Sequence, residues 1–333
     1  MTARTRVGVV GAGNIATIAQ LPTLVDREDI ELAALVTRKD DPSHLMRRWG
    51  FGKAYRTVEE MLESEELGAA FILTPRFAHA EAVQACLANG LDVFCEKPLA
   101  PTVAESRALA DSADKVDRIL MVDFNRRYAP VYAAGREAFG HKGATFCVAQ
   151  KNRPGSEYRA TFENAIHMID LIRWYCGGHP IEVSAHAAGQ DEWEEDGTAA
   201  LIRFDNGNTG ILTAARTAAR WGEKLDAYGH STSVEIIAPE SISISTPTGT
   251  TSRSLSSEAF GWATATQTLG FAEAVHHFLD RIKDRNQPLT SAREAVATQQ
   301  LLDQILTAAG LPTHEAPNRE WTSQATSQIG GTR

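Results

Sequence analysis

A glycine-rich segment near the start of the chain has the composition of a phosphate-binding turn. Gly11-Ala12-Gly13-Asn14-Ile15-Ala16 directly follows the apolar run Arg6–Val10 and should open a helix. The first glycine permits a tight turn, the second lets the main chain approach a diphosphate, and small Ala16 lets the helix pack on the strand. The helix start adds free N–H groups for phosphate oxygens. This predicts a dinucleotide site with contacts from Gly11, Gly13, Asn14 and Ile15.

The end of the second apolar strand bears on which dinucleotide binds. An acidic residue there bonds the ribose 2′-hydroxyl of NAD, whereas an arginine accommodates the 2′-phosphate of NADP. Here the strand ends in Thr37 and Arg38, and Asp40 and Asp41 follow too late. We therefore expect NADP, with NAD as the second choice. The alternative interpretation of Arg38 is a solvated loop residue.

Short apolar strands that alternate with helices must hold these residues in place. The strands lack polar alternation, as expected for a sheet covered on both faces. They are Val7–Val10, Leu32–Val36, Ala69–Thr74, Asp92–Cys95 and Ile119–Val122. His79–Ala88 and Val103–Ala113 are predicted helices, the second with Thr102 as its N-cap. This alternation predicts a doubly wound parallel sheet, a Rossmann domain over residues 1–122.

The pattern changes after residue 122. The predicted strands are now Ala144–Gln150, Ile181–Ala188, Thr198–Phe204, Thr209–Ala215, Ser233–Ala238 and Ile242–Thr246. Asp205-Asn206-Gly207 is a hairpin turn, because Asn and Gly tolerate positive φ. The predicted helices are Phe162–Cys176, Gly270–Asp284 and Ala292–Ala309. The fold class is thus α/β followed by α+β: an open, mainly antiparallel sheet with helices on one face over 123–312, then a polar tail over 313–333.

Composition excludes several classes of function. A net charge of −9 argues against nucleic-acid and anionic-membrane partners. The first residues show no signal-peptide pattern, and no apolar run approaches the roughly 20 residues that span a bilayer. The four cysteines lack CxxC pairing and metal-ligand spacing, and the ten histidines contain no HExxH pattern. We expect reduced thiols, no metal site and a cytoplasmic location.

Several further motifs occur in an order that resembles one protein family. Glu96-Lys97-Pro98 follows the fourth strand, with Thr74-Pro75 and His79 upstream and Asn125-Arg126-Arg127 downstream. With the Asp196–Gly210 hairpin and the Gly270–Pro312 ending, they resemble the glucose–fructose oxidoreductase, inositol dehydrogenase and rhizopine-catabolism family (Gfo/Idh/MocA) from about residue 4 to 312. The resemblance implies an NAD(P)-dependent oxidoreductase acting on a sugar, cyclitol or related polyol or keto-sugar.

The resemblance also implies roles for particular residues. It makes Lys97 the active-site lysine, with a cis bond to Pro98, and gives cofactor contacts to Thr74, Pro75, His79, Glu96 and Lys97. It places the site at the carboxyl edge of the first sheet. It further implies a homodimer or homotetramer that forms through the exposed face of the second sheet.

A second family motif, an acid followed four residues later by a histidine, is similar to Glu163 and His167. Residues four apart share a helix face, so Glu163, His167 and Asp170 can line one side. The chain departs from the family in two ways. Glutamate replaces the usual aspartate, and Tyr158-Arg159-Ala160-Thr161 replaces a glycine-rich run.

Hydride transfer from an alcohol requires a base for the hydroxyl proton and a cation beside the developing alkoxide. Neutral histidine titrates near working pH, which suits His167 as the base, and the Lys97 ammonium supplies the charge. Glu163 is expected to orient the imidazole, and Asn125 and Arg127 to frame the substrate, although Arg127 also suits a structural role. The competing hypothesis is a dinucleotide- and sugar-sensing regulator without turnover. Such a regulator need not keep both Lys97 and His167.

Overall fold

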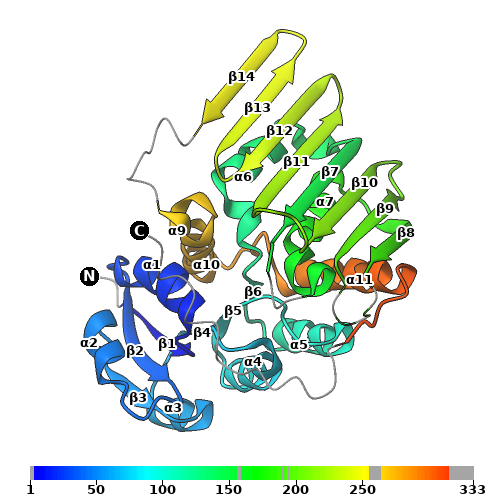
Figure 1. The fold of residues 1–333 in the computed structure, drawn as a ribbon. Coiled ribbons are helices and arrows are strands. Elements are labelled where there is room, and N and C mark those ends of the chain that lie inside the picture. The colour runs from blue at the N-terminus through cyan, green and yellow to red at the C-terminus, as the bar shows by residue number, and fades with distance from the viewer. Residues whose placement is uncertain are drawn as a thin grey trace, which may run out of the picture.

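The computed structural model describes residues 4–155, 159–189, 191, 193, 195–254 and 264–314. These residues form two sheets with their covering helices (Figure 1). Tyr158 and nearly all of the predicted tail lie outside the described residues.

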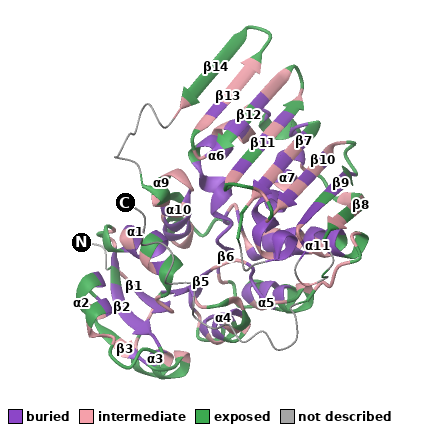
Figure 2. Ribbon diagram, in the orientation of Figure 1, coloured by how far each residue is buried: buried purple, intermediate pink, exposed green. Residues whose placement is uncertain are grey.

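The first sheet has six parallel strands in the order β3-β2-β1-β4-β5-β6. Their bounds are β1 (Thr5–Val10), β2 (Ile30–Val36), β3 (Lys53–Tyr55), β4 (Ala69–Ile72), β5 (Asp92–Cys95) and β6 (Leu120–Val122). Strands β4, β5 and β6 are buried along their whole length (Figure 2), because helices cover both faces. The strand order is that of a dinucleotide-binding sheet, so the predicted Rossmann fold is confirmed.

Helices pack on both faces of this sheet. They are α1 (Leu21–Val25), α2 (Ser43–Trp49), α3 (Val58–Ser64), α4 (His79–Ala88) and α5 (Val103–Lys115). Thr102 caps α5 as predicted, since its hydroxyl accepts a hydrogen bond of 3.2 Å from the Glu105 N–H. Met61, Val83 and Leu109 join the core on one face, and Leu24 and Trp49 join the core on the other.

A helix from the C-terminal part of the chain also packs on the first sheet. The Phe278 ring of α10 (Phe271–Asp284) lies 5.3 Å from the ring of Phe71 on β4 and 5.7 Å from that of Phe94 on β5. These edge-on aromatic contacts fix α10 on the face that α1 and α2 cover. The proposed division of the chain at residue 122 remains a prediction. Helix α10 lies after residue 122 in the sequence but packs on the first sheet.

The second sheet has eight strands in the order β14-β13-β12-β11-β7-β10-β9-β8. Their bounds are β7 (Phe146–Asn152), β8 (Pro180–Ala188), β9 (Gly197–Phe204), β10 (Thr209–Ala215), β11 (Gly222–Gly229), β12 (Thr232–Ala238), β13 (Ser241–Thr246) and β14 (Gly249–Ser254). The β7–β10 pair is parallel and the other pairs are antiparallel, so the predicted mainly antiparallel sheet is confirmed. Gly207, with φ of +85°, makes the predicted turn between β9 and β10.

Buried and exposed residues alternate along the central strands of this sheet (Figure 2), because helices cover one face only. The remaining helices are α6 (Pro130–Glu137), α7 (Ile166–Cys176), α9 (Ala265–Thr268) and α11 (Ala292–Ala308). Helix α7 packs on β7 and β10. Helix α11 packs on β8 and also on α5, one of the helices that cover the first sheet. The predicted helix Phe162–Cys176 is divided, since a π-helical turn (Ala160–Asn164) precedes α7.

The cysteines and the helices bear on two further predictions. All four cysteines are buried free thiols. In the part of the chain that is described, no helix is both long enough and apolar enough to cross a membrane.

Candidate functional site

The turn after β1 has an open surface that suits a dinucleotide. Gly11 has φ of +92°, and a Cβ there would lie 2.9 Å from the Leu73 carbonyl oxygen, so the position requires glycine. A Cβ at Gly13 would meet no described atom within 4 Å. Asn14 is exposed, and Ile15 is 53% exposed despite its apolar side chain. The main chain at Gly13 is therefore open to a diphosphate, beside uncovered apolar surface.

The loop after β2 presents a cation at the expected position. The Thr37 N–H donates to the Tyr55 carbonyl oxygen at 3.0 Å, which fixes the start of the loop. The Arg56 guanidinium donates to the Arg38 carbonyl oxygen at 2.9 Å and to the Asp40 carboxylate at 3.0 Å. Asp40 is thus paired with Arg56 at the surface, whereas the exposed Arg38 guanidinium has no partner among the described residues.

A buried histidine holds two other predicted loops together. His79 Nδ1 lies 2.8 Å from the Pro98 carbonyl oxygen and Nε2 lies 2.8 Å from the Thr74 carbonyl oxygen. The Lys97–Pro98 bond is cis, as predicted. A Cβ at Gly11 would lie 3.0 Å from Thr74, so the loops after β1 and β4 are adjacent. The structure therefore makes His79 a positioning residue between the predicted cofactor loops.

An acidic pair lies under the Lys97 loop. Gln20 Nε2 donates to Glu96 at 2.7 Å and to Asp123 at 2.9 Å. Burial raises the pKa of Glu96 and that of Asp123, and repulsion between the two carboxylates adds to the rise for Asp123. The Lys97 N–H donates to the other Glu96 oxygen at 3.2 Å. This pair fixes the main chain from which the Lys97 side chain extends.

The Lys97 side chain reaches from the first sheet to the turn before α7. Its ammonium donates to the Glu163 carbonyl oxygen at 3.2 Å. Burial lowers the pKa of Lys97 to about 8, against the opposing attraction of Glu96 and Glu163. The Glu163 carboxylate is held by Arg76 at 2.8 Å and by the Arg159 N–H. Lys97 and Glu163 are thus brought together, with the lysine charge near the start of α7.

His167 lies one helical turn further along, in the first turn of α7. It is 8% exposed, and its Nδ1 has no partner in the described structure. Burial places the pKa of His167 well below its usual value, and the charges of Lys151 and Lys97 lower it further. The imidazole is therefore neutral at pH 7 and able to accept a proton. The buried Asn164 side chain also has no described partner for its nitrogen or its oxygen.

Three predicted residues are not brought into this group. Arg127 forms a buried two-point ion pair with Asp170, at 2.8 and 2.7 Å, and also contacts Glu294. Asn125 is fully buried and donates to the Leu269 carbonyl oxygen at 2.9 Å. These contacts favour structural roles for Arg127 and Asp170. Asn125 is held through its amide nitrogen, whereas its Oδ1 has no described partner. Glu163 is bonded to Arg76 and not to His167, so the structure does not show it orienting the imidazole.

Lys151 and Glu223 are not among the residues that the sequence predicts for the site, whereas their partner Arg126 belongs to a predicted motif. The Lys151 ammonium lies 2.7 Å from the Glu223 carboxylate, which also accepts hydrogen bonds from Nε and Nη2 of Arg126 at 2.8 and 2.7 Å. Lys151 extends from the helix-facing side of β7, on which Cys147 and Ala149 are buried. A charged residue that continues the buried alternation of a predicted strand was the available signal.

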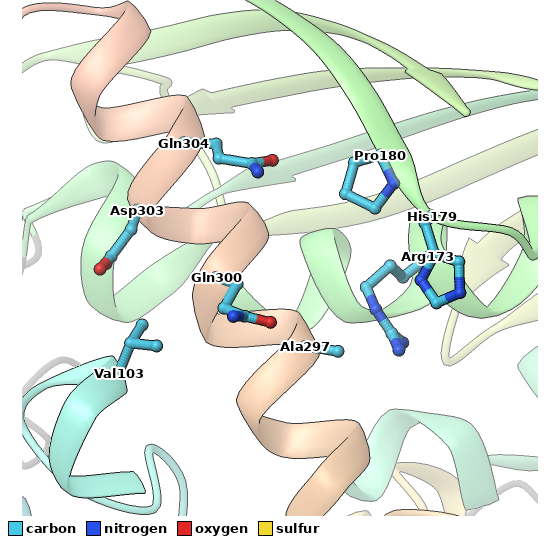
Figure 3. A pocket seen from close by; sticks show the side chains of 8 residues that line it. All are labelled: Val103, Arg173, His179, Pro180, Ala297, Gln300, Asp303 and Gln304. Atoms are coloured by element: carbon cyan, nitrogen blue, oxygen red, sulfur yellow. The ribbon is translucent and has the colours of Figure 1, made fainter. Parts of the chain in front are cut away.

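A separate pocket of about 360 Å³ lies between α5, α7, α11 and β8 (Figure 3). It is lined by Val103, Arg173, His179, Pro180, Ala297, Gln300, Asp303 and Gln304. None of these residues belongs to the predicted site. Over the described ranges, no three or more His, Cys, Asp or Glu side chains are grouped as a metal site would require.

The fold and this site define a protein with a dinucleotide-binding type of Rossmann sheet followed by a second, mainly antiparallel sheet. The family model "Oxidoreductase family, NAD-binding Rossmann fold" matches residues 5–124, and the "GFO/IDH/MocA C-terminal domain" model matches residues 148–235. The chain belongs to the Gfo/Idh/MocA oxidoreductase family.

Three known proteins illustrate the similarity. The chain is 30% identical to inositol 2-dehydrogenase 2 of Paenarthrobacter aurescens, over 71% of this chain and 73% of that protein. It is 27% identical to myo-inositol 2-dehydrogenase of Thermotoga maritima, over 67% and 72%. An oxidoreductase from Agrobacterium radiobacter, solved with NAD+, L-tartaric acid and magnesium, has the same fold. Its TM-score is 0.81 at 18% identity, covering 92% of this chain and 97% of that one.

Proposed function

We propose that this protein is an NAD(P)-dependent dehydrogenase or reductase that acts on a CH–OH group of a sugar, cyclitol or related keto-sugar. The observation that carries the proposal is the meeting of Lys97 with the segment that carries His167. Lys97 lies in the loop after β5 of the first sheet, and His167 lies on α7, which packs on the second sheet. The Lys97 ammonium contacts the carbonyl of Glu163, four residues before the imidazole. A cation beside a neutral base is what proton removal from an alcohol requires.

The residues that would hold the cofactor lie along the carboxyl edge of the first sheet. Gly11, Gly13 and Asn14 would receive the diphosphate, and Thr37 and Arg38 the adenosine ribose. Thr74, Pro75 and Glu96 lie on the loops that follow β4 and β5 of the same sheet. When bound, the nicotinamide supplies the hydride donor or acceptor. We favour NADP because Arg38 is exposed and Asp40 is already paired.

His167 accepts the hydroxyl proton in the oxidation direction and returns it in reduction. In the oxidation direction, its lowered pKa keeps the imidazole neutral before the reaction, so no proton must first be removed. In reduction, the imidazole must first take up a proton from solvent. Lys97 stabilises the developing negative charge on the same oxygen. Glu163 positions the lysine through its carbonyl oxygen, and its ion pair with Arg76 ties this turn to the loop after β4. The unpartnered Asn164 amide and His167 Nδ1 can bond substrate hydroxyls.

The names of the relatives support the substrate class, since both curated relatives described above are inositol dehydrogenases. The same fold without turnover would act as a sugar-sensing regulator. Absorbance at about 340 nm separates the two activities, because reduced nicotinamide absorbs there and a binding protein leaves it unchanged. We expect turnover of at least one member of a panel of sugars and cyclitols. Sugar binding without turnover across the panel would favour the regulator.

We also propose that copies of the chain pair through the outer face of the second sheet. Phe146 and Tyr228 are exposed register partners on β7 and β11, and Leu201 and Ile237 are exposed on β9 and β12. Exposed apolar side chains on a sheet face favour association. Light scattering should give a dimer or tetramer, and Leu201→Glu with Tyr228→Glu should lower the mass. A monomeric unmodified protein would contradict this. The cytoplasmic location stays a prediction.

A further inference from the structure

The inner face of the second sheet carries an ion cluster that the roles above do not use. Every second residue of β7 from Cys147 onwards points to the buried face of the sheet. These residues are Cys147, Ala149 and Lys151, and Lys151 is only 4% exposed. Glu223 of β11 lies directly opposite Lys151 in the register of the two strands and is also buried. Charged residues in such positions are rare unless they are paired or functional.

The cluster has more cations than anions. The Arg126 guanidinium donates one hydrogen bond to each Glu223 oxygen, at 2.8 and 2.7 Å. One of these oxygens also lies 2.7 Å from the Lys151 ammonium. One carboxylate therefore serves two cations. An ammonium has three N–H donors, and Glu223 is the only partner that the described residues offer Lys151.

The neighbouring carboxylates are engaged elsewhere. Glu163 is paired with Arg76, and Asp170 with Arg127. Asp226 is paired with Lys224. Glu96 and Asp123 share Gln20, and burial favours their protonated forms. None of these described groups supplies the charge that the Lys151–Arg126 cluster lacks.

The excess charge acts on the proposed catalytic histidine. The cations that lower the pKa of His167 are Lys151, Lys97, Arg126 and Arg153, with Lys151 first among them after burial. Burial and the charges of Arg126 and Lys97 also lower the pKa of Lys151, to about 7, although Glu223 opposes this. Helix α7, which carries His167, packs on β7, and Lys151 lies on the buried side of β7, so its charge faces the segment that carries the proposed base.

We propose that the substrate carries an anionic group, a carboxylate or a phosphate ester, and that Lys151 binds this group next to the carbon that exchanges hydride. The proposal rests on the proposed function and narrows its substrate class to sugar acids or sugar phosphates. The anion supplies the countercharge that Glu223 cannot give to both cations, and buried charges are costly without one. The unpartnered amide of Asn164 and Nδ1 of His167 would then bond hydroxyls of the same molecule.

The first test compares matched neutral and anionic substrates of the unmodified protein at saturating NADP+. The pairs are D-glucose with D-glucuronate, D-gluconate and D-glucose 6-phosphate, and myo-inositol with its 1-phosphate. We expect a kcat/KM about 10- to 100-fold higher for an anionic member, the factor for one charged hydrogen bond. The two kinds of anion separate carboxylate from phosphate recognition. Equal or better turnover of the neutral parents would overturn the inference and leave the dehydrogenase function intact.

The same pairs are also tested by calorimetric binding to the NADP+-loaded protein. This measurement decides the inference even if no panel member turns over, in which case only the dehydrogenase function fails. Tighter binding of the anionic member, weakened by added salt, supports the inference. Equal binding of both members overturns it.

The second test uses Lys151→Met, which removes the charge but keeps most of the apolar stem. The ratio of anionic to neutral binding should fall about 10- to 100-fold. Lys151→Arg should retain most of that ratio because the charge remains. Lys224→Met is the matched control, since Lys224 is exposed on β11 and paired with Asp226 at 2.8 Å. An unchanged ratio in Lys151→Met, or an equal loss in Lys224→Met, would overturn the role of Lys151.

Proton uptake provides a readout that a purely structural lysine would not change. With a pKa of about 7, Lys151 is partly neutral at pH 7.5, and a bound anion favours its protonated form. Calorimetry in two buffers of different ionisation enthalpy should show proton uptake with the anionic substrate. Lys151→Met should remove this uptake. Equal uptake in the variant would contradict the proposal.

Discussion

The Lys97 ammonium donates a hydrogen bond of 3.2 Å to the main-chain carbonyl oxygen of Glu163. This contact links the loop after β5 of the first sheet to the turn before α7, the helix that packs on the second sheet. Because the partner is a carbonyl oxygen, the lysine keeps its charge and two further N–H donors. His167 follows Glu163 by one helical turn, which places the proposed base beside the proposed cation.

Lys97 and His167 should act as one unit. We expect Lys97→Ala and His167→Ala each to lower kcat on the order of 10²–10⁴-fold, with cofactor binding retained. The double variant should be little worse than the poorer single variant, because groups that act on one oxygen are non-additive. Glu163→Gln should cost less than either, since its carbonyl oxygen remains. Steady-state kinetics with cofactor titration tests this, and near-normal turnover in both single variants would refute the mechanism.

The pH profile of alcohol oxidation should follow the Lys97 charge. The ammonium has a pKa of about 8, so kcat/KM should fall above about pH 8 as the cation is lost. His167 has a pKa well below its usual value, so the base stays neutral and activity should persist below pH 6.5. Lys97→Arg retains its charge at high pH and should move the alkaline limb upward. An alkaline limb that does not move in this variant would assign it to another group.

The two glycines of the β1 turn should fail in different ways. Gly11→Ala places a Cβ at φ of +92° and 2.9 Å from the Leu73 carbonyl oxygen, so the melting temperature should fall. Gly13→Val points into open space, so the protein should fold normally but lose dinucleotide affinity. Thermal melts and fluorescence titration with NADPH separate the two effects. Normal titration of a folded Gly13→Val variant would mean that the cofactor lies elsewhere.

The sequence predicted the strands that have a clear apolar face and missed those that do not. Strands β1, β2, β4, β5 and β6 are buried apolar runs, and all five were predicted. Strand β3 has three residues with Lys53 exposed, and all described residues of β14 are polar or glycine and largely exposed, so neither shows periodicity. In β11 an inward-facing position is occupied by the charged residue Glu223, which can be buried because it pairs with Lys151 and Arg126. That pairing breaks the alternation by which a strand is recognised.

Sequence patterns also identify the residues of the functional site only in part. Lys97 and His167 are found from short motifs, but sequence does not show that Glu163 bonds Arg76, a residue 87 positions away. The strand predicted over Ala144–Gln150 ends one residue before Lys151, so the strand pattern does not include Lys151. Arg127 and Asp170 matched the pattern of site residues, and yet they form a buried pair. Contacts between distant segments decide which polar residues remain available to a ligand.

The pocket in Figure 3 yields a prediction about stability. Burial raises the pKa of Asp303 to about 6. Below about pH 3 the carboxyl is protonated in folded and unfolded chains alike, whereas above about pH 6 the folded chain holds a poorly solvated charge, so stability falls as pH rises through this range. The side chain is only half-buried, and solvent limits the effect to about 1 kcal/mol. Asp303→Asn should raise the free energy of unfolding by that amount at pH 7.5 and leave it unchanged at about pH 3. Urea titrations at both pH values test this, and an equal gain at both would assign the effect to another cause.

Arg38 should determine the choice between NADP and NAD. Its guanidinium is exposed at the end of β2, while Arg56 pairs with Asp40 at the surface and donates to the Arg38 and Lys39 carbonyl oxygens. Arg38→Ala should therefore weaken NADPH binding by roughly 1–3 kcal/mol, the range for a charged hydrogen bond, and change NADH binding little. Arg48→Ala is the matched control, because Arg48 is exposed on the neighbouring α2 and stacks on Trp49 at 4.6 Å. That variant loses the same charge and should keep the preference. Fluorescence titration of both cofactors measures these affinities. Equal affinities for NADPH and NADH in the unmodified protein would refute the preference and make Arg38 a solvated loop residue.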